Sequence, residues 1–256
     1  MSGYSEFSAV YDCLMADAQY PERTGYILSL FEKYGKEPTL LLDLACGTGS
    51  FTLEFAKRGI ETIGVDMSEE MLSIAREKAF DEAVNILFLC QKGEELDLYG
   101  TVDGAVCCMD SVNHITDIES LEKVIAKVSL FMEKDSLFIF DVNTPYKHEK
   151  VLGNNTFVFE EDDIFGVWQN TYNKDTCITD ICLDFFVATQ DGMYERFSEE
   201  ISERAYTVKE LENILKKYDF EVLAVLGDMS QESVKETDER AYFVAKKVRE
   251  TNGYYE

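Results

Sequence analysis

The chain has 256 residues, and its 50 acidic side chains outnumber 24 basic ones, which gives a formal net charge of −26. Phosphate binding depends on clustered lysine and arginine, so we expect no nucleic-acid partner. The surplus acid fits either a solvated acidic surface or electrostatic steering of cationic and amine substrates. No apolar stretch reaches the length of a membrane span and no secretory signal stands at the N-terminus, so we expect no membrane partner and a cytoplasmic location.

Cysteines and histidines are the residues that bear on metals and redox chemistry. The chain carries seven cysteines and two histidines, with no Cys-x-x-Cys pair. An odd number of cysteines in a reducing compartment favours free thiols over disulfides. With so few histidines we predict no metal site. Composition does not distinguish a monomer from a homodimer.

The first 35 residues predict two helices. Apolar side chains at helical spacing around Tyr11 are followed by a loop at Tyr20-Pro21 and by a second apolar stripe that includes Phe31. These helices either cover a sheet edge or form a lid over a ligand.

A strand, a glycine turn and a helix follow, and they are the most informative stretch of the chain. The apolar run 40–44 predicts a buried strand that leads into Gly47-Thr48-Gly49. Glycine lets the backbone approach a ligand closely and adopt positive φ in so tight a turn. A second strand, 61–65, ends on Asp66, about twenty residues after the turn, where a carboxylate can accept both hydroxyls of an unphosphorylated ribose. The pattern predicts a nucleotide-cofactor site.

The turn lacks one part of the dinucleotide fingerprint. Thr52 stands where that fingerprint has its third glycine. Asp43 also places negative charge near the turn, which would repel a pyrophosphate and suit a cationic ligand. A nicotinamide-dependent oxidoreductase therefore stays only as a weaker alternative.

Two further strands end in polar residues. The strand 86–90 leads into the loop 91–94, and the strand 102–108 delivers a polar cluster to the edge where open α/β sheets bind ligands. That cluster contains Met109, Asp110, Ser111, Asn113 and His114. A capping box at Thr116–Glu119 is expected to start the next helix, which leaves the cluster available for function.

After a fifth strand at 137–140 the periodicity changes. Residues 156–206 alternate apolar and polar side chains around a turn at 190–192, which is typical of antiparallel strands with one solvated face. The strand–helix pattern resumes at Thr207. We therefore predict one domain formed by 1–150 and 207–256, with 1–35 as a helical lid, and an inserted antiparallel module at 151–206.

The motifs together resemble a known family. The run Asp43-Leu44-Ala45-Cys46-Gly47-Thr48-Gly49, then Gly64-Val65-Asp66-Met67-Ser68 and residues 102–114, is similar to three motifs of class I S-adenosylmethionine (SAM) dependent methyltransferases, small bacterial members with an unassigned substrate above all. The resemblance spans nearly the whole chain. It implies an α/β, Rossmann-like sheet with helices on both faces, and methyl transfer from SAM to an N- or O-nucleophile of a small molecule, with S-adenosylhomocysteine as product. A non-catalytic SAM-binding regulatory or interaction protein is the alternative.

The resemblance also implies roles for individual residues. His114 is the first candidate for a general base, followed by Asp110 and Tyr11. The inserted module is implied to roof the acceptor pocket. Related enzymes often hold the adenine with a short acidic residue in the loop 91–94, and Lys92-Gly93 departs from that pattern. Acceptor-binding candidates are Asn113, Trp168, Tyr172, Tyr194 and Arg204; cofactor-binding candidates are Asp43, Ala45, Cys46, Gly47, Gly49, Asp66, Met67, Gln91, Lys92, Gly93, Glu94 and Met109.

Overall fold

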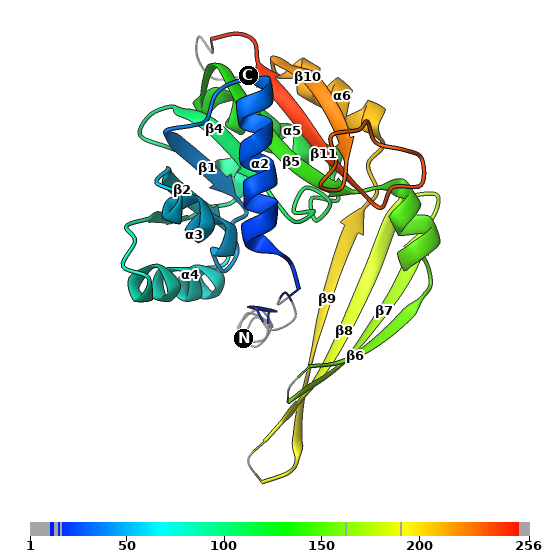
Figure 1. Cartoon of the computed structure of the whole chain (residues 1–256). Helices are drawn as coiled ribbons and strands as arrows, with labels where there is room; N and C mark the ends of the chain where they lie inside the picture. Colours follow the sequence, from blue (N-terminus) through cyan, green and yellow to red (C-terminus); the bar gives the residue numbers. More distant parts are fainter. Residues whose placement is uncertain (1–10, 13–14, 16, 162, 190, 251–256) are drawn as a thin grey trace.

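The structure is a computed structural model that describes residues 11, 12, 15, 17–161, 163–189 and 191–250. A sheet with helices on both faces forms the main body, and a second, narrower sheet projects from it (Figure 1). Most of the expected first helix lies outside the described residues; the second is α2, Tyr20–Tyr34. No helix in the described ranges is both long enough and apolar enough to cross a membrane.

The main sheet has seven strands in the order β10-β11-β5-β4-β1-β2-β3. β11 pairs antiparallel with both β5 and β10, and the other pairs are parallel. The α/β fold class is confirmed. The strands are β1 Leu40–Leu44, β2 Glu61–Asp66, β3 Leu87–Cys90, β4 Val102–Cys107, β5 Met132–Asn143, β10 Phe220–Gly227 and β11 Arg240–Lys247.

The helices cover both faces of this sheet. α3 (Ser50–Lys57) and α4 (Glu69–Asp81) connect the strands on the side of α2, and α5 (Ile118–Phe131) and α6 (Val208–Lys217) cover the opposite side. Helix starts are capped as the sequence indicates at two places: Ser68 accepts from the Met71 N–H, and Thr207 with Glu210 forms a capping box. The box expected at Thr116–Glu119 is wrong by one residue, because Asp117 is the cap of α5.

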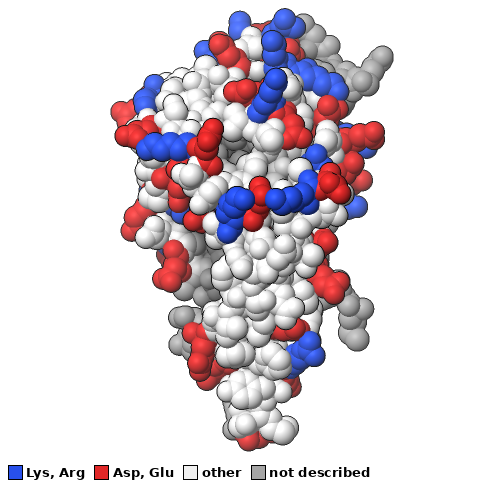
Figure 2. All heavy atoms as spheres, turned by 90° about the vertical axis from the view of Figure 1, so that its right-hand side faces the viewer, with Lys and Arg blue, Asp and Glu red and all other residues white. Residues whose placement is uncertain are grey.

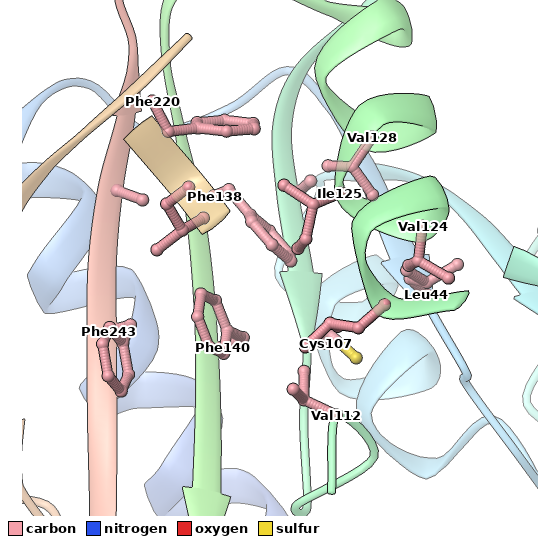
Figure 3. Packing of buried hydrophobic residues seen from close by; sticks show 14 of the residues in the cluster. Leu44, Cys107, Val112, Val124, Ile125, Val128, Phe138, Phe140, Phe220 and Phe243 are labelled. Carbon is pink, nitrogen blue, oxygen red and sulfur yellow. The ribbon is translucent and has the colours of Figure 1, made fainter. Parts of the chain in front are cut away.

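Two hydrophobic clusters, one on each face, hold the sheet between its helices. Alternation along a strand sends Leu41 into one cluster and Leu42 into the other. On the α5 side, Phe140 and Phe243 from neighbouring strands stack with ring centroids 4.9 Å apart, in the same cluster as Val124, Ile125 and Val128 of α5 (Figure 3). Burial on both faces explains the near-continuous apolar strands of the sequence.

The inserted module is an antiparallel sheet of four strands in sequence order: β6 Thr156–Glu161, β7 Ile164–Asn173, β8 Ile178–Ala188 and β9 Tyr194–Arg204. A short helix, η2 (Lys147–Leu152), leads into it from β5. One face carries the apolar residues Ile164, Ile181, Leu183 and Phe185, as the period-two pattern predicted. Charged side chains of both signs are interspersed over the main body and sparser on the module (Figure 2).

Asn113 joins the module to the main sheet. Its side-chain oxygen accepts from the Asn143 N–H at 2.9 Å, and its amide donates to the carbonyls of Asn143 and Arg204 at 3.1 and 2.8 Å. Its own carbonyl accepts from the Arg204 N–H at 2.7 Å. The side chain is fully buried. The sequence placed Asn113 in the acceptor site, whereas its amide is already committed to the ends of β5 and β9.

We predict that Asn113→Ala lowers the free energy of unfolding by roughly 2–4 kcal/mol, because it leaves buried backbone groups of two strands without partners. Urea denaturation would measure the loss. Ser202→Ala is the control, since its hydroxyl donates to the exposed Asp180 at 2.7 Å and its removal should cost less than about 0.5 kcal/mol. Equal losses of unfolding free energy in the two variants would contradict the role of Asn113 in joining the module to the main sheet.

Candidate active site

The turn after β1 forms a cradle of backbone groups. Ala45, Gly47 and Gly49 all adopt positive φ, at 56°, 54° and 74°. A Cβ on Gly49 would lie 2.8 Å from the Cβ of Ala75 on α4, so glycine is required there by packing as well as by conformation. The Cys46 N–H donates to the carbonyl of Val65 at 3.0 Å, which ties the cradle to β2.

Asp66, at the end of β2, braces the same turn. One carboxylate oxygen accepts from the Gly47 N–H at 2.8 Å and the other from the Ser68 N–H at 2.9 Å. Burial raises the pKa of Asp66, while these backbone bonds favour its ionised form. Each oxygen keeps a second lone pair, so the carboxylate can still accept a hydroxyl.

Asp43 lies beneath the cradle and is buried. Its carboxylate accepts from the Thr52 hydroxyl at 2.6 Å. Thr52 is the residue that replaces the third glycine of a dinucleotide fingerprint, and the structure gives it a purpose there as the partner of a buried acid. Burial raises the pKa of Asp43 to about 7, with the charge of Asp66 adding to the effect.

A cavity opens beside the cradle, lined by the turn from Ala45 to Thr48 and by Met109 and Tyr11 among others. The Asp12 carboxylate contacts the turn and α4: it accepts from the Thr48 hydroxyl at 2.7 Å and pairs with Lys78 at 2.6 Å. These contacts place Tyr11 where a lid would lie; the lid itself stays a prediction.

The loop after β3 is the expected adenine site. The Gln91 N–H donates to the Asp66 carbonyl at 2.9 Å, so the loop starts beside the ribose acid. The Gln91 side chain, however, bonds to the backbone of Asp97 in both directions, at 2.9 and 3.1 Å. Gly93 packs close to α5, where a Cβ would meet Val124 at 3.1 Å. Met67, with 62% of its surface exposed, is free to cover a ring. Lys92 is exposed and Glu94 half-buried.

The end of β4 is held in an unusual conformation. Met109 and Asp110 both have positive φ, 56° and 51°, which costs energy for residues with a side chain. Their N–H groups donate to the Asp141 carboxylate at 2.8 and 3.0 Å, and Arg240 pairs with Asp141 and, at 2.6 Å, with Asp110. Burial opposes ionisation of Asp110, but Arg240 and Lys147 outweigh it and bring its pKa to about 2.

His114 and Asp110 meet a third side chain that sequence reasoning missed. Glu203, on β9, lies with one oxygen 3.9 Å from Nε2 of His114, and the ligand atoms of all three residues lie within 4.8 Å of one another. The Glu203 side chain is 6% exposed and that of His114 is 42% exposed. The sequence held a signal for this. Glu199 and Glu203 occupy the same alternate positions of the strand as Phe197 and Ile201, which places both acids on the apolar face rather than on the solvated one.

Strand register divides the acceptor candidates between two faces. Tyr172 pairs with Thr179 and Thr179 with Glu203, so Tyr172 shares the face of Glu203, and Trp168 lies on the same face. Tyr194 pairs with Ala188 near the far tip of the module and is 62% exposed. Arg204 is on the opposite face from Glu203, with its guanidinium near Glu210 and over the Tyr206 ring. The structure does not bring these last two to the cluster.

Comparison with known proteins places this geometry in a family. Residues 41–134, which contain the cradle and the end of β4, match the model of a methyltransferase domain. YqeM of Bacillus subtilis (strain 168), which is named as a methyltransferase, is 33% identical over 245 residues, 95% of this chain and 97% of its own. The chain belongs to the class I SAM-dependent methyltransferases.

Solved structures agree. A SAM-dependent methyltransferase from Clostridium acetobutylicum ATCC 824 is 32% identical, with a TM-score of 0.85 over 97% of this chain and 100% of its own. SAM-bound CalS10, an amino pentose methyltransferase from Micromonospora echinaspora, shares the fold at 18% identity, with a TM-score of 0.76 over 93% and 97% of the chains. The cofactor of this methyltransferase is SAM.

The described residues fit SAM. The positive-φ turn exposes backbone beside the cavity, Asp66 has acceptor capacity for ribose hydroxyls, and the two acids Asp43 and Asp66 suit a cationic ligand. Which residues contact each part of the cofactor stays a prediction, and the next experiment tests it for Asp66.

We predict that Asp66→Ala weakens binding of S-adenosylhomocysteine by about 10- to 100-fold, as expected for loss of roughly 1.5–3 kcal/mol of charge-assisted hydrogen bonding. Calorimetric titration would measure the affinity. Asp66→Asn keeps a side-chain oxygen that can accept from the Gly47 N–H but removes the negative charge. It therefore separates support of the turn from binding of the ribose. Glu69→Gln removes an exposed acid nearby and is the control. Wild-type affinity in Asp66→Ala would refute the assignment.

Asp43 predicts a pH dependence of stability without ligand. Because burial raises its pKa in the folded protein to about 7, its contribution is full below about pH 4 and is lost as pH rises through 7. Relative to wild type, Asp43→Asn should therefore gain roughly 4 kcal/mol of unfolding free energy between pH 4 and 8. Urea denaturation over this range is the measurement. Asp81→Asn, an exposed acid at the end of α4, should follow wild type; parallel curves for all three proteins would contradict the prediction.

Proposed function

We propose that this methyltransferase transfers a methyl group to a nitrogen or oxygen nucleophile of a small-molecule acceptor by in-line displacement. One observation carries the proposal: Met109 lines the cofactor cavity, and the next residue, Asp110, belongs to the cluster with His114 and Glu203. Cofactor wall and acid–base groups are thus adjacent along the chain. When bound, SAM supplies an electrophilic methyl group on a sulfonium.

The protein's own residues then have three tasks. The turn from Ala45 to Gly49 would hold the cofactor, with Asp66 on its ribose and the 91–94 loop and Met67 around its adenine. Tyr11 and the inner face of the module would exclude water from the acceptor side. A base would remove the proton of a hydroxyl acceptor, or of an amine that arrives as an ammonium ion.

Among the candidates for that base, His114 suits the role best. Its side chain is the most exposed of the cluster and reaches towards Glu203. Burial raises the pKa of Tyr11 far above its ordinary value, so its phenol stays protonated and can only donate a hydrogen bond. The low pKa of Asp110, caused by Arg240 and Lys147, makes it a weak proton acceptor and a fixed negative charge.

We predict that His114→Ala slows methyl transfer by about 10²- to 10⁴-fold while leaving affinity for S-adenosylhomocysteine within a few-fold of wild type. Transfer is followed with a labelled methyl donor and a metabolite extract as acceptor source. Tyr11→Phe is the comparison, and a smaller loss is expected because only a hydrogen bond is removed. Unchanged turnover in His114→Ala would eliminate the general-base role.

Two parallel titrations test the class itself. Micromolar binding of S-adenosylhomocysteine without binding of NADH supports the proposal, whereas binding of NADH alone would overturn it. Binding of S-adenosylhomocysteine with no transfer from any extract would favour a non-catalytic SAM-binding protein.

A further inference from the structure

Glu203 is a buried carboxylate that points into the acceptor side of the site. Its Oε2 accepts from Nδ2 of Asn143 at 3.1 Å and lies 3.7 Å from Nε2 of His148. Its Oε1 faces His114 at 3.9 Å, beyond hydrogen-bond length. The acid is thus anchored to the main sheet through one oxygen and presents the other to the cluster.

Glu203 has charges of both signs nearby but, among the described residues, no direct ion pair with a lysine or arginine. Burial and the charge of Asp110 raise its pKa, and His114 and Lys147 oppose them. His148 is fully buried and its pKa is lowered to about 4, so it stays neutral. Lys147 donates to Asn143 at 2.9 Å. In the described part of the chain no lysine or arginine forms an ion pair with Glu203.

Arg240 does not pair with Glu203 either, because its guanidinium forms ion pairs with Asp141 and Asp110. A buried carboxylate without a cation is costly, and such a group is usually paired or used. The unpaired acid therefore points to a cationic ligand that arrives with the acceptor.

The spacing of the cluster admits an ammonium ion. An ammonium nitrogen that donates to three acceptors at about 2.8 Å places them about 4.6 Å apart, whereas a metal bound at about 2.1 Å draws its ligands to about 3.0–3.4 Å. The 3.9 Å between His114 and Glu203 lies between these two values, and no pair of ligand atoms in the cluster is more than 4.8 Å apart, so the cluster has room for an ammonium. Arg240, at 2.6 Å from Asp110, would also repel a divalent ion.

We propose that the acceptor is a primary or secondary amine that enters as an ammonium ion bound by Asp110, His114 and Glu203, with the Glu203 carboxylate as its counter-charge and His114 as the base that takes its proton. This inference rests on the proposed methyl transfer and narrows its nucleophile to nitrogen.

The step balances as follows. The ammonium R–NH3⁺ gives one proton to Nε2 of His114 and becomes R–NH2, while the Glu203 carboxylate keeps its negative charge. The nitrogen lone pair forms a bond to the methyl carbon as the carbon–sulfur bond breaks and its electron pair stays on sulfur. The products are R–NH2⁺–CH3 and neutral S-adenosylhomocysteine, and the protonated His114, which is partly exposed, then returns its proton to solvent.

Glu199 supplies a matched control. It lies on the same strand and the same face, four residues before Glu203, and it is also buried. Glu203→Gln and Glu199→Gln therefore remove equivalent charges from equivalent backbone, but only the first touches the cluster.

The first experiment blocks amines. A metabolite extract is treated with an acylating reagent, and labelled methyl transfer by the wild-type enzyme is compared in treated and untreated portions. We expect acylation to remove at least nine tenths of the labelled product. We also expect Glu203→Gln to lower transfer at least tenfold at subsaturating acceptor, with Glu199→Gln within twofold of wild type. Labelling that survives acylation would overturn the inference and leave the proposed methyl transfer standing.

The second experiment needs no natural acceptor. Protein saturated with S-adenosylhomocysteine is titrated with n-butylammonium and with n-butanol, and binding is followed by NMR. We expect saturable binding of n-butylammonium alone, weakened at least tenfold by Glu203→Gln and unchanged by Glu199→Gln. Absence of that preference overturns the amine inference. Failure of the protein to bind S-adenosylhomocysteine instead overturns the proposed function.

Discussion

The Asp141 carboxylate is the interaction on which both halves of the site depend. It accepts the N–H groups of Met109 and Asp110 and holds two consecutive residues with side chains in the left-handed region, a conformation that costs roughly 1–2 kcal/mol per residue. Arg240 balances the charge that this requires inside the sheet. The result is that one short turn points Met109 towards the cofactor cavity and Asp110 towards the acceptor cluster.

Under the proposed function, the inserted module supplies a side chain of the acceptor site as well as its cover. Asn113 ties the end of β9 to the end of β5, and Glu203 stands one residue before the strand end that this joint fixes. The acid therefore reaches the cluster with its backbone already held by hydrogen bonds. A loop could carry the same residue, but a loop would hold its carboxylate less precisely against a reacting atom.

The sequence predicts the main sheet and the cofactor turn well, because their signals are local. Apolar runs define the strands, glycine and Asp66 mark the turn, and Ser68 and Thr207 mark helix starts. Their structural consequences follow from residues a few positions apart. The switch to period two near residue 156 likewise identifies the module, since alternation is a property of one strand.

What the sequence could not supply depends on contacts between distant segments. Alternation separates Tyr194 and Arg204 from Glu203, but only the register of β7, β8 and β9 shows that Trp168 and Tyr172 share the face of Glu203. In the sequence, Asn113 is one of several polar residues that follow a strand. It is buried because segments about 30 and 90 residues away pack around it, and a local pattern does not show such tertiary contacts.

The distribution of acid in the site suits the direction in which charge moves during methyl transfer to an amine. Positive charge leaves sulfur and appears on nitrogen, so carboxylates near the cofactor stabilise the reactants, whereas carboxylates near the acceptor stabilise the developing ammonium. Asp43 lines the cofactor cavity and Asp66 supports its turn through the Gly47 N–H, whereas Asp110 and Glu203 belong to the cluster proposed to hold the acceptor. Because Asp43 is neutralised more easily than Asp110, with pKa values of about 7 and about 2, the fixed negative charge is stronger where the nitrogen would become charged. That asymmetry favours the transition state over the bound cofactor, which is the condition for faster chemistry rather than tighter binding.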